Sequence, residues 1–381
     1  MSKTYLITLT PTGKFFFGGD MTFQVGANEK DEFNKKYMSY IIRSNKLPQQ
    51  TSLLGMLRFL ILRNDETAFD ASKQEIVNDN KAEELIGSGS FRMGKADGYG
   101  KIKKLYPCFI QKDGKAIPYL ERDYKYEVRF NESKGHTNKK AFFDLPEIVG
   151  YNAKDGIPSL YLIDNIEVPE IDIFVEDVSN GINRDIVTGK VDENAYFKQV
   201  CYRFNDKIYE YEKPGYDNKR EHKKDSNGKE ISHHCEYKFA FYAELDITDE
   251  ELKKYDNSLV SLGGDNSQFV INIKPDEPEK KGTHGKCVVL DSPAYLCPDD
   301  LDNVRFAITD TIPFKCMKTE TETVKAYNRG RHQYEYTKGL NLYNRGSVFY
   351  FTTEEDANEF TTKLQSHAEF YQIGYNHCKV K

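Results

Sequence analysis

Histidine and cysteine, the residue types most often used to bind zinc, gather in one polar stretch of the chain. His222, His233, His234 and Cys235 lie close together in the sequence. A zinc site needs four ligands, usually in spaced pairs, whereas the adjacent His233 and His234 would point to opposite sides of a strand. The stretch therefore favours a solvated loop, and we expect no metal site.

Two further patterns are typical of catalytic chemistry. Gly18, Gly19 and Asp20 match the GGD of a nucleotide-cyclase palm. Metal-dependent transfer needs at least two carboxylates in a fixed geometry, however, and Asp20 stands alone, so a tight turn explains the glycines better. His332 and His377 are candidate general bases for RNA cleavage, but neither has an evident partner in the sequence. We therefore expect no enzymatic activity and no cofactor.

Polar and basic residues suited to phosphate surround one predicted helix. Residues 33–64 contain lysines and arginines but no acidic side chain. The expected helix begins with Gln49, Gln50, Thr51 and Ser52, whose amides and hydroxyls suit phosphate oxygens at a helix N-terminus. Gly55 permits a close approach of a backbone or a phosphate. A core helix with solvated arginines is the alternative, and the helix alone does not separate the two.

Three arginine-bearing turns offer similar chemistry. Asn183 and Arg184 lie in NGINRDIVTG, where they offer several donors to a phosphate or a base edge; a plain surface hairpin is the alternative. The sequence YNRG occurs at 327–330 and again at 343–346. Each copy combines charge for a nucleic-acid backbone with a tyrosine ring for stacking, so we favour binding loops over plain turns.

The elements that would position these residues indicate an α+β fold. Residues 4–10 predict a strand, a Gly-Gly turn follows, and apolar residues at helical spacing predict a helix over 49–63. This order opens a ferredoxin-like β-α-β-β-α-β unit. Near the other end we expect a strand, a helix with a capping box at Thr352 and Glu355, and a short closing strand. A second Gly-Gly pair at 263–264 suggests two related halves.

Composition limits the class of protein. The 381 residues are 38% hydrophobic and include 26 Tyr and 24 Phe, which favour strands around a packed core. The net charge of −6 is unusual for a free-standing nucleic-acid binder, so we expect basic islands inside a larger assembly. Seven cysteines without a C-x-x-C pair indicate a reducing cytoplasm. The longest apolar stretch is too short to cross a membrane.

Several segments together resemble a known family. They are KFFFGGDMTF, SNKLPQQTSLLGMLR, NGINRDIVTGKVDENAYF, SLGGD and GLNLYNRGSVFYF. In order and spacing they are similar to the Cmr branch of the CRISPR RAMP proteins, and most similar to the third Cmr subunit of type III-B complexes. The resemblance covers residues 8–374. It departs at 345–348, where the family commonly has A-G-S-V and this chain has RGSV, and at the insertion 213–230.

The resemblance implies two ferredoxin-like (RRM/RAMP-type) units with inserted β-hairpins and loops, which we place at residues 1–175 and 176–381. It implies a cytoplasmic, non-catalytic subunit of a hetero-oligomeric antiviral complex. Such a subunit grips the repeat-derived 5′ handle of the crRNA and docks on the large cyclase/polymerase subunit, beside the Cmr backbone RAMP subunits. Two alternatives stay open: a guide-RNA-processing endoribonuclease of the RAMP superfamily, and a purely protein-binding scaffold.

The resemblance also suggests which residues contact RNA. They match family motifs or lie in adjacent basic turns. The expected RNA-binding residues are Arg43, Lys46, Gln49, Gln50, Thr51, Ser52, Arg58, Asn183, Arg184, Arg329, Arg331 and Arg345.

Overall fold

The first strand of the chain lies inside an antiparallel sheet. In this computed structural model β1 (Lys3–Pro11) pairs with β17 (Tyr237–Leu245) on one side and with β19 (Gln268–Pro275) on the other. The strand order is β18-β19-β1-β17-β7-β8, and β6 also pairs with β17. The remaining strands are β18 (Leu259–Ser261), β6 (Ile102–Leu105), β7 (Phe109–Lys112) and β8 (Lys115–Ala116).

The structure describes most of the chain, and every statement below concerns that part. It comprises residues 2–19, 21–24, 39–130, 146–152, 156–157, 159–184, 188, 190–209, 223–279, 282, 284–316 and 337–381. The expected contact residues Arg329 and Arg331, the candidate base His332 and most of the insertion 213–230 lie outside it.

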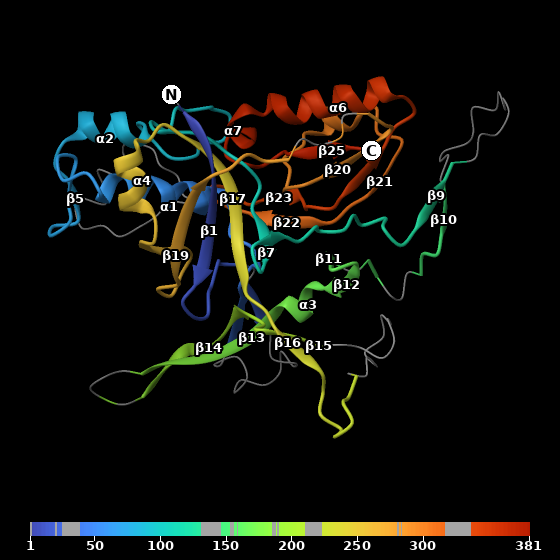
Figure 1. Ribbon diagram of the computed structural model, residues 1–381, viewed down its shortest axis with the longest axis horizontal. Helices are drawn as coiled ribbons and strands as arrows, with labels where there is room; N and C mark the ends of the chain where they lie inside the picture. The colour runs from blue at the N-terminus through green and yellow to red at the C-terminus, as the bar shows by residue number, and fades with distance from the viewer. Residues whose placement is uncertain are drawn as a thin grey trace.

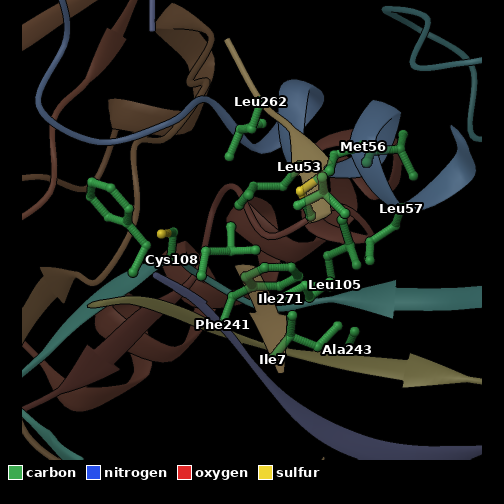
Figure 2. Close-up of a cluster of buried hydrophobic side chains, with 14 of the residues drawn as sticks. Ile7, Leu53, Met56, Leu57, Leu105, Cys108, Phe241, Ala243, Leu262 and Ile271 are labelled. Carbon is green, nitrogen blue, oxygen red and sulfur yellow. The ribbon is translucent and has the colours of Figure 1, made fainter. Parts of the chain in front are cut away.

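Helix α1 (Gln50–Arg63) packs its apolar side on this sheet. Its sequence places leucine and isoleucine at helical spacing, and Leu53 and Met56 are buried. Figure 2 shows both side chains on the helix side of the core. Ile7, Phe241 and Ile271 come from β1, β17 and β19 and meet them from the sheet. The helix predicted over 49–63 is therefore confirmed, and its first residues lie at one end of the core.

A smaller antiparallel sheet is formed near the C-terminus, in the order β21-β24-β20-β25. Its strands are β21 (Phe306–Ile308), β24 (Val348–Tyr350), β20 (Cys287–Leu290) and β25 (Cys378–Val380). Helix α6 (Glu354–Ser366) lies along this sheet (Figure 1) and buries Phe360 and Leu364 against Phe349 and neighbouring residues. The predicted closing strand at the C-terminus is confirmed.

The boundary expected at 175/176 falls inside an insertion between two strands of the large sheet. β1 and β7 precede that boundary, whereas β17 and β19 follow it, and β1 pairs along its length with both of the later strands. The large sheet is therefore built from both sides of residue 175. The fold is mixed α and β, as the sequence predicts.

A third sheet has the order β13-β14-β3-β2. Its strands are β13 (Phe174–Arg184), β14 (Val191–Phe204), β3 (Ser39–Arg43) and β2 (Met21–Gln24). β13 and β14 form a long antiparallel hairpin that extends away from the other sheets (Figure 1), with Arg184 opposite Val191. Residues 180–184, the first half of NGINRDIVTG, therefore form the end of β13.

Short hairpins and helices complete the described structure. The hairpins are β4 (Phe69–Asp70) with β5 (Glu75–Ile76), β9 (Glu127–Arg129) with β10 (Glu147–Val149), β11 (Leu160–Ile163) with β12 (Ile166–Pro169), β15 (Lys207–Tyr209) with β16 (Ser232–His234), and β22 (Thr311–Phe314) with β23 (Leu340–Tyr343). The helices are α2 (Asp79–Ile86), α3 (Glu170–Ile173), α4 (Asp249–Tyr255), the 3-10 helix η2 (Pro298–Leu301) and α7 (Ala368–Tyr371). Within the described residues no helix is long and apolar enough to cross a membrane.

The two Gly-Gly turns lie against each other. Phe16 forms a β-bridge with Gly264, whose backbone N–H donates to the Phe16 carbonyl at 2.7 Å. Gly263 has a φ of +90°, and a Cβ there would lie 2.2 Å from the Phe16 oxygen, so only glycine fits. A Cβ on Gly19 would likewise lie 1.9 Å from the Arg43 carbonyl oxygen. The glycines thus have a packing role.

The C-terminal helix differs in detail from the prediction. Its capping box uses Thr353 and Asp356, one residue after the predicted Thr352 and Glu355, because the Thr353 hydroxyl accepts from the Asp356 N–H and the Asp356 carboxylate accepts in return. The helix ends at Ser366. His367, with φ −74° and ψ 67°, separates it from α7.

Candidate functional site

A cleft of about 490 Å³ opens beside the start of α1. One wall is the segment 43–50, which leads into α1. Another wall is formed by residues of α3 and by the first residues of β13. The remaining lining comes from parts of the chain far apart in sequence, including Cys108, Tyr119, the β22–β23 hairpin and the turn at 344–345. The volume falls in the range of roughly 300–1,000 Å³ that is usual for ligand sites.

The cleft brings together five of the residues expected to contact RNA. Three of them belong to the wall before α1, one begins the helix itself, and the last belongs to the second YNRG turn. They are Arg43, Lys46, Gln49, Gln50 and Arg345.

Backbone hydrogen bonds hold the wall before α1 in place. The Ser44 hydroxyl accepts from the Phe17 N–H at 2.8 Å, and the Ser44 N–H donates to the Val200 carbonyl at 2.9 Å. The Asn45 N–H donates to the Gly18 carbonyl at 2.8 Å. The first Gly-Gly turn and β14 thus fix the direction in which the segment enters α1.

The two cations of this wall are paired with carboxylates across the cleft. Lys46 Nζ lies 2.7 Å from Glu170 Oε2, and the Lys46 and Glu170 side chains are 30% and 19% exposed. Arg43 pairs with Glu176 and donates to the Tyr202 hydroxyl at 3.3 Å. The hydrogen bond with Tyr202, and next that with Glu176, raise the pKa of Arg43, so this guanidinium stays charged beside its acid.

Gln50 is buried at the base of the cleft with its amide held in one orientation. Its Nε2 donates to the carbonyls of Tyr106 and Gly374, both at 3.0 Å. A Cβ on Gly374 would lie 2.3 Å from that nitrogen, so the glycine makes room for the amide. With both amide hydrogens in use, Oε1 is fixed as an acceptor, and it is buried without a hydrogen-bond partner among the described residues.

Arg345 lines the cleft but is committed to the fold. The residue is 7% exposed, and its guanidinium donates to the Cys108 carbonyl and lies 5.4 Å from the centre of the Tyr119 ring. Gly346 has a φ of +75° and packs on the same ring. Burial raises the pKa of the neighbouring Cys108 thiol to about 12, so that side chain is neutral. Arg345 therefore joins the second YNRG turn to the large sheet.

Arg58 belongs to α1 but does not line the cleft. Its guanidinium lies at the C-terminal end of α2. Its Nε donates to the Ile86 carbonyl at 2.9 Å and its Nη2 to the Gly87 carbonyl at 3.4 Å. These carbonyls are at the negative end of a helix, where a cation is favourable, although burial lowers the pKa of Arg58. Gly55, which like Arg58 belongs to α1, is exposed. A Cβ added at Gly55 would have no neighbour within 4 Å outside the backbone of its own helix.

The other residues expected to contact RNA do not line the cleft among the described residues. Thr51 and Ser52 are half-buried in the first turn of α1 and do not belong to the cleft lining within the described chain. Asn183 and Arg184 end β13 in the long hairpin, where only the backbone is described. The structure thus gathers one part of the expected set and leaves the hairpin separate from it.

Sequence reasoning missed the acidic and aromatic half of the cleft. Glu170 and Glu176 belong to a stretch of the chain that is rich in acidic residues. Its composition shows where negative charge is concentrated but not which cations it meets. The rings that line the cleft come from five separate elements or loops, so no local pattern connects them. They are Tyr119, Phe174, Tyr202, Phe314 and Tyr375. Four of these rings are buried, and only Tyr119 is partly exposed among the rings of the described lining. The cleft therefore offers cations at its mouth, which suit an anionic ligand such as a nucleotide, together with one accessible ring.

Nearly the whole chain matches a known protein family. The sequence pattern described as "CRISPR-associated protein (Cas_Cmr3)" matches residues 7–380. The chain belongs to this family. The resemblance to the third Cmr subunit is thereby confirmed. Among curated proteins no match was found.

Two solved structures are also similar to the chain. One is the "Cryo-EM structure of the Type III-B Cmr-beta bound to cognate target RNA and AMPPnP, state 1", with 14% identity, a TM-score of 0.47, and coverage of 99% of this chain and 96% of that chain. The other is the "Cryo-EM structure of the Type III-B Cmr-beta bound to cognate target RNA", with 13% identity, a TM-score of 0.48 and the same coverage.

Proposed function

We propose that this Cmr3-family chain is a non-catalytic subunit of a type III-B effector complex and holds the 5′ handle of the crRNA in the cleft beside α1. The observation that carries the proposal is the meeting of Lys46, Arg43 and the fixed Gln50 amide in one aromatic-lined cleft. Lysine and arginine neutralise phosphates, and Tyr119, the partly exposed ring among the described lining residues, is where an unpaired base would stack. Single-stranded RNA is the ligand that uses both.

The ion pairs explain how an acidic chain holds RNA. In the free protein Glu170 and Glu176 neutralise Lys46 and Arg43. A phosphate that approaches the cleft competes with these carboxylates, and it brings two or more acceptor oxygens to each cation. The cations are therefore available to a polyanion while the surface around them stays nearly neutral, which disfavours non-specific RNA.

Gln50 holds an acceptor at the base of the cleft. Its Oε1 accepts but cannot donate in the observed orientation. This oxygen is buried, so in the observed structure Gln50 orders the start of α1 rather than contacting a nucleobase.

We also propose that each main sheet is a variant of the β-α-β-β-α-β unit. In the large sheet β1, α1, β7, β17, α4 and β19 follow in chain order and give the strand order β19-β1-β17-β7. In the small sheet β20, η2, β21, β24, α6 and β25 give the same order, β25-β20-β24-β21. The two units then occupy about residues 3–275 and 287–380, with the β13–β14 hairpin inserted in the first.

A processing ribonuclease is the less favoured alternative. His377 is 7% exposed, its ring stacks on Tyr371 at 4.4 Å, and its Nε2 lies 3.2 Å from the Tyr371 carbonyl oxygen. A carbonyl only accepts, so Nε2 carries a proton and points into the fold. This geometry supports a packing role for His377, in a subunit that binds RNA in the cytoplasm without cutting it.

The test compares cleft cations with a remote one. The effector complex is reconstituted with the wild-type chain, with the double variant Arg43→Ala, Lys46→Ala, or with Lys73→Ala, whose exposed side chain pairs with Asp70 and Glu75 in the β4–β5 hairpin. Affinity for an RNA with the 5′ handle is measured against salt. We expect the double variant to bind roughly tenfold more weakly, equivalent to about 1.4 kcal/mol. Its log–log salt slope should be shallower by about 1.4, or about 0.7 for each lost contact.

The controls decide between RNA binding and a scaffold role. Lys73→Ala should match the wild type in both affinity and slope. Normal RNA content in the double variant, with an unchanged slope, would reject the cleft as the RNA site. Stable association with partner subunits that persists after RNase treatment and in the double variant would instead favour the protein-binding alternative.

A further inference from the structure

Three different metal-ligating side chains meet between η2 and the end of α6. Cys297 Sγ, a carboxylate oxygen of Asp300 and a ring nitrogen of His367 all lie within 4.8 Å of one another. His367 Nε2 is 2.8 Å from Asp300 Oδ2, and those two side chains are 18% and 13% exposed. The group is separate from the RNA cleft, because none of its members belongs to the cleft lining.

Secondary structure holds each of the three residues at this point. Cys297 is the N-cap of η2 and Asp300 is its third residue, and the Asp300 carboxylate accepts from the Cys297 N–H at 2.7 Å. His367 lies at the break between α6 and α7. The three candidate metal ligands are therefore held by two helix ends that are far apart in sequence. For this reason no local sequence motif predicts the cluster.

A capping box and an ion pair engage all three side chains in the absence of a metal. The Cys297 sulfur accepts from the Asp300 N–H, and the Asp300 carboxylate accepts from the Cys297 N–H and pairs with His367. Serine or threonine, the usual N-cap residues, would serve this capping role, whereas a cysteine also places a soft metal ligand within 4.8 Å of the other two. In a tetrahedral zinc site with bonds of about 2.0–2.3 Å, ligand atoms lie roughly 3.3–3.7 Å apart. The His367 and Asp300 atoms, 2.8 Å apart, are slightly closer than this, and the Cys297 sulfur lies within 4.8 Å of both, so side-chain adjustments of up to about an ångström would bring the three atoms to tetrahedral spacing.

Tyr295, which lies next to the Cys297 sulfur, is also placed to support a bound metal. The Tyr295 hydroxyl lies 3.5 Å from Cys297 Sγ, and the Tyr295 ring packs edge-on against His367 at 5.2 Å. The hydroxyl is therefore within reach of a metal-bound sulfur. Such outer contacts orient the ligands of metal sites.

We propose that Cys297, Asp300 and His367 bind one Zn²⁺ ion, with water as the fourth ligand, and that the ion joins η2 to the α6–α7 junction. Thiolate and imidazole select Zn²⁺ over Mg²⁺ or Ca²⁺, which prefer oxygen ligands. The Cys297 thiol loses its proton on binding, so affinity for zinc rises with pH. The ends of η2, α6 and α7 are then held at one point.

The experiment uses the untagged full chain, stripped with a chelator and titrated with Zn²⁺ alone. Bound zinc is measured by mass spectrometry of the metal, and Co²⁺ is added in parallel to reveal a thiolate charge-transfer band. We expect one Zn²⁺ per chain, a zinc-dependent rise in Tm, and a cobalt band that Cys297→Ser removes. His367→Gln keeps a donor for Asp300 but lacks the imidazole, and it should weaken zinc binding by at least roughly tenfold.

Matched variants exclude other zinc-binding residues. Cys287→Ser changes a half-buried cysteine of β20, and His233→Ala with His234→Ala changes the exposed histidines of β16; both proteins should bind zinc like the wild type. The proposal is overturned if the wild type holds no zinc after titration. It is equally overturned if Cys297→Ser and His367→Gln bind zinc as tightly as the wild type, or if the control variants lose it. RNA affinity plays no part in these readouts, so the result is independent of the proposed function.

Discussion

Two groups of cations in this chain have opposite environments. Lys46 and Arg43 pair with carboxylates at the mouth of the cleft, whereas Arg345 and Arg58 donate to backbone carbonyls within the fold. All four were expected to contact RNA, because sequence shows only their charge. A carboxylate can be replaced by a phosphate, but a backbone carbonyl left without its donor in the interior destabilises the protein.

The comparison shows that the role of a basic residue, in RNA binding or in stability, depends on the group that it contacts in the free protein. An ion pair between half-exposed side chains is weak, of the order of 0–1 kcal/mol, so a ligand can displace it. A guanidinium that satisfies buried carbonyls is part of the packing. The first group should therefore govern RNA affinity, and the second should govern stability.

The largest expected effect is on stability. Arg345→Ala removes the donor to the Cys108 carbonyl and empties space beside the Tyr119 ring. We expect the free energy of unfolding to fall by about 3 kcal/mol, measured by urea denaturation of the full chain. Lys46→Ala, the matched cleft variant, should lose no more than about 1 kcal/mol. Equal losses in the two variants would remove the distinction between the groups.

Arg58→Ala is expected to have the next largest effect. It leaves the carbonyls of Ile86 and Gly87 at the end of α2 without their side-chain donor. The free energy of unfolding should fall by about 1–2 kcal/mol, and hydrogen exchange should increase in α2 before it increases in the large sheet. RNA affinity of the folded fraction should be unchanged. Weaker RNA binding with normal stability would move Arg58 into the first group.

The carboxylates of the cleft provide a gain-of-binding test. Glu170→Gln keeps the shape of the side chain but releases the charge of Lys46, so handle RNA no longer competes with an acid. We expect binding about three- to fivefold tighter, in line with a weak ion pair of up to about 1 kcal/mol. Glu84→Gln is the matched control, since Glu84 pairs with Lys81 on the remote α2. Unchanged affinity in Glu170→Gln would show that Lys46 does not contact the RNA.

The sequence predicts the local elements well and the cleft only in part. The helix over 49–63 follows from apolar spacing, and its first residues do reach the cleft. The sequence does not predict Glu170 and Tyr119, because their place in the cleft beside the start of that helix depends on parts of the chain distant in sequence. The division at 175/176 follows from the resemblance, whereas β1 pairs with residues 230 or more positions away along the chain.

The smallest expected effect separates charge from shape at the cleft mouth. Arg43→Lys keeps the positive charge but loses the guanidinium that reaches both Glu176 and the Tyr202 hydroxyl. If Arg43 acts on RNA through charge, affinity should change by less than about twofold and the salt slope should stay the same. Arg43→Gln, which removes the charge, should make the slope shallower by about 0.7. A loss in Arg43→Lys as large as that in Arg43→Gln would instead assign Arg43 a bidentate contact with one phosphate, because lysine cannot reproduce the two parallel hydrogen bonds of a guanidinium.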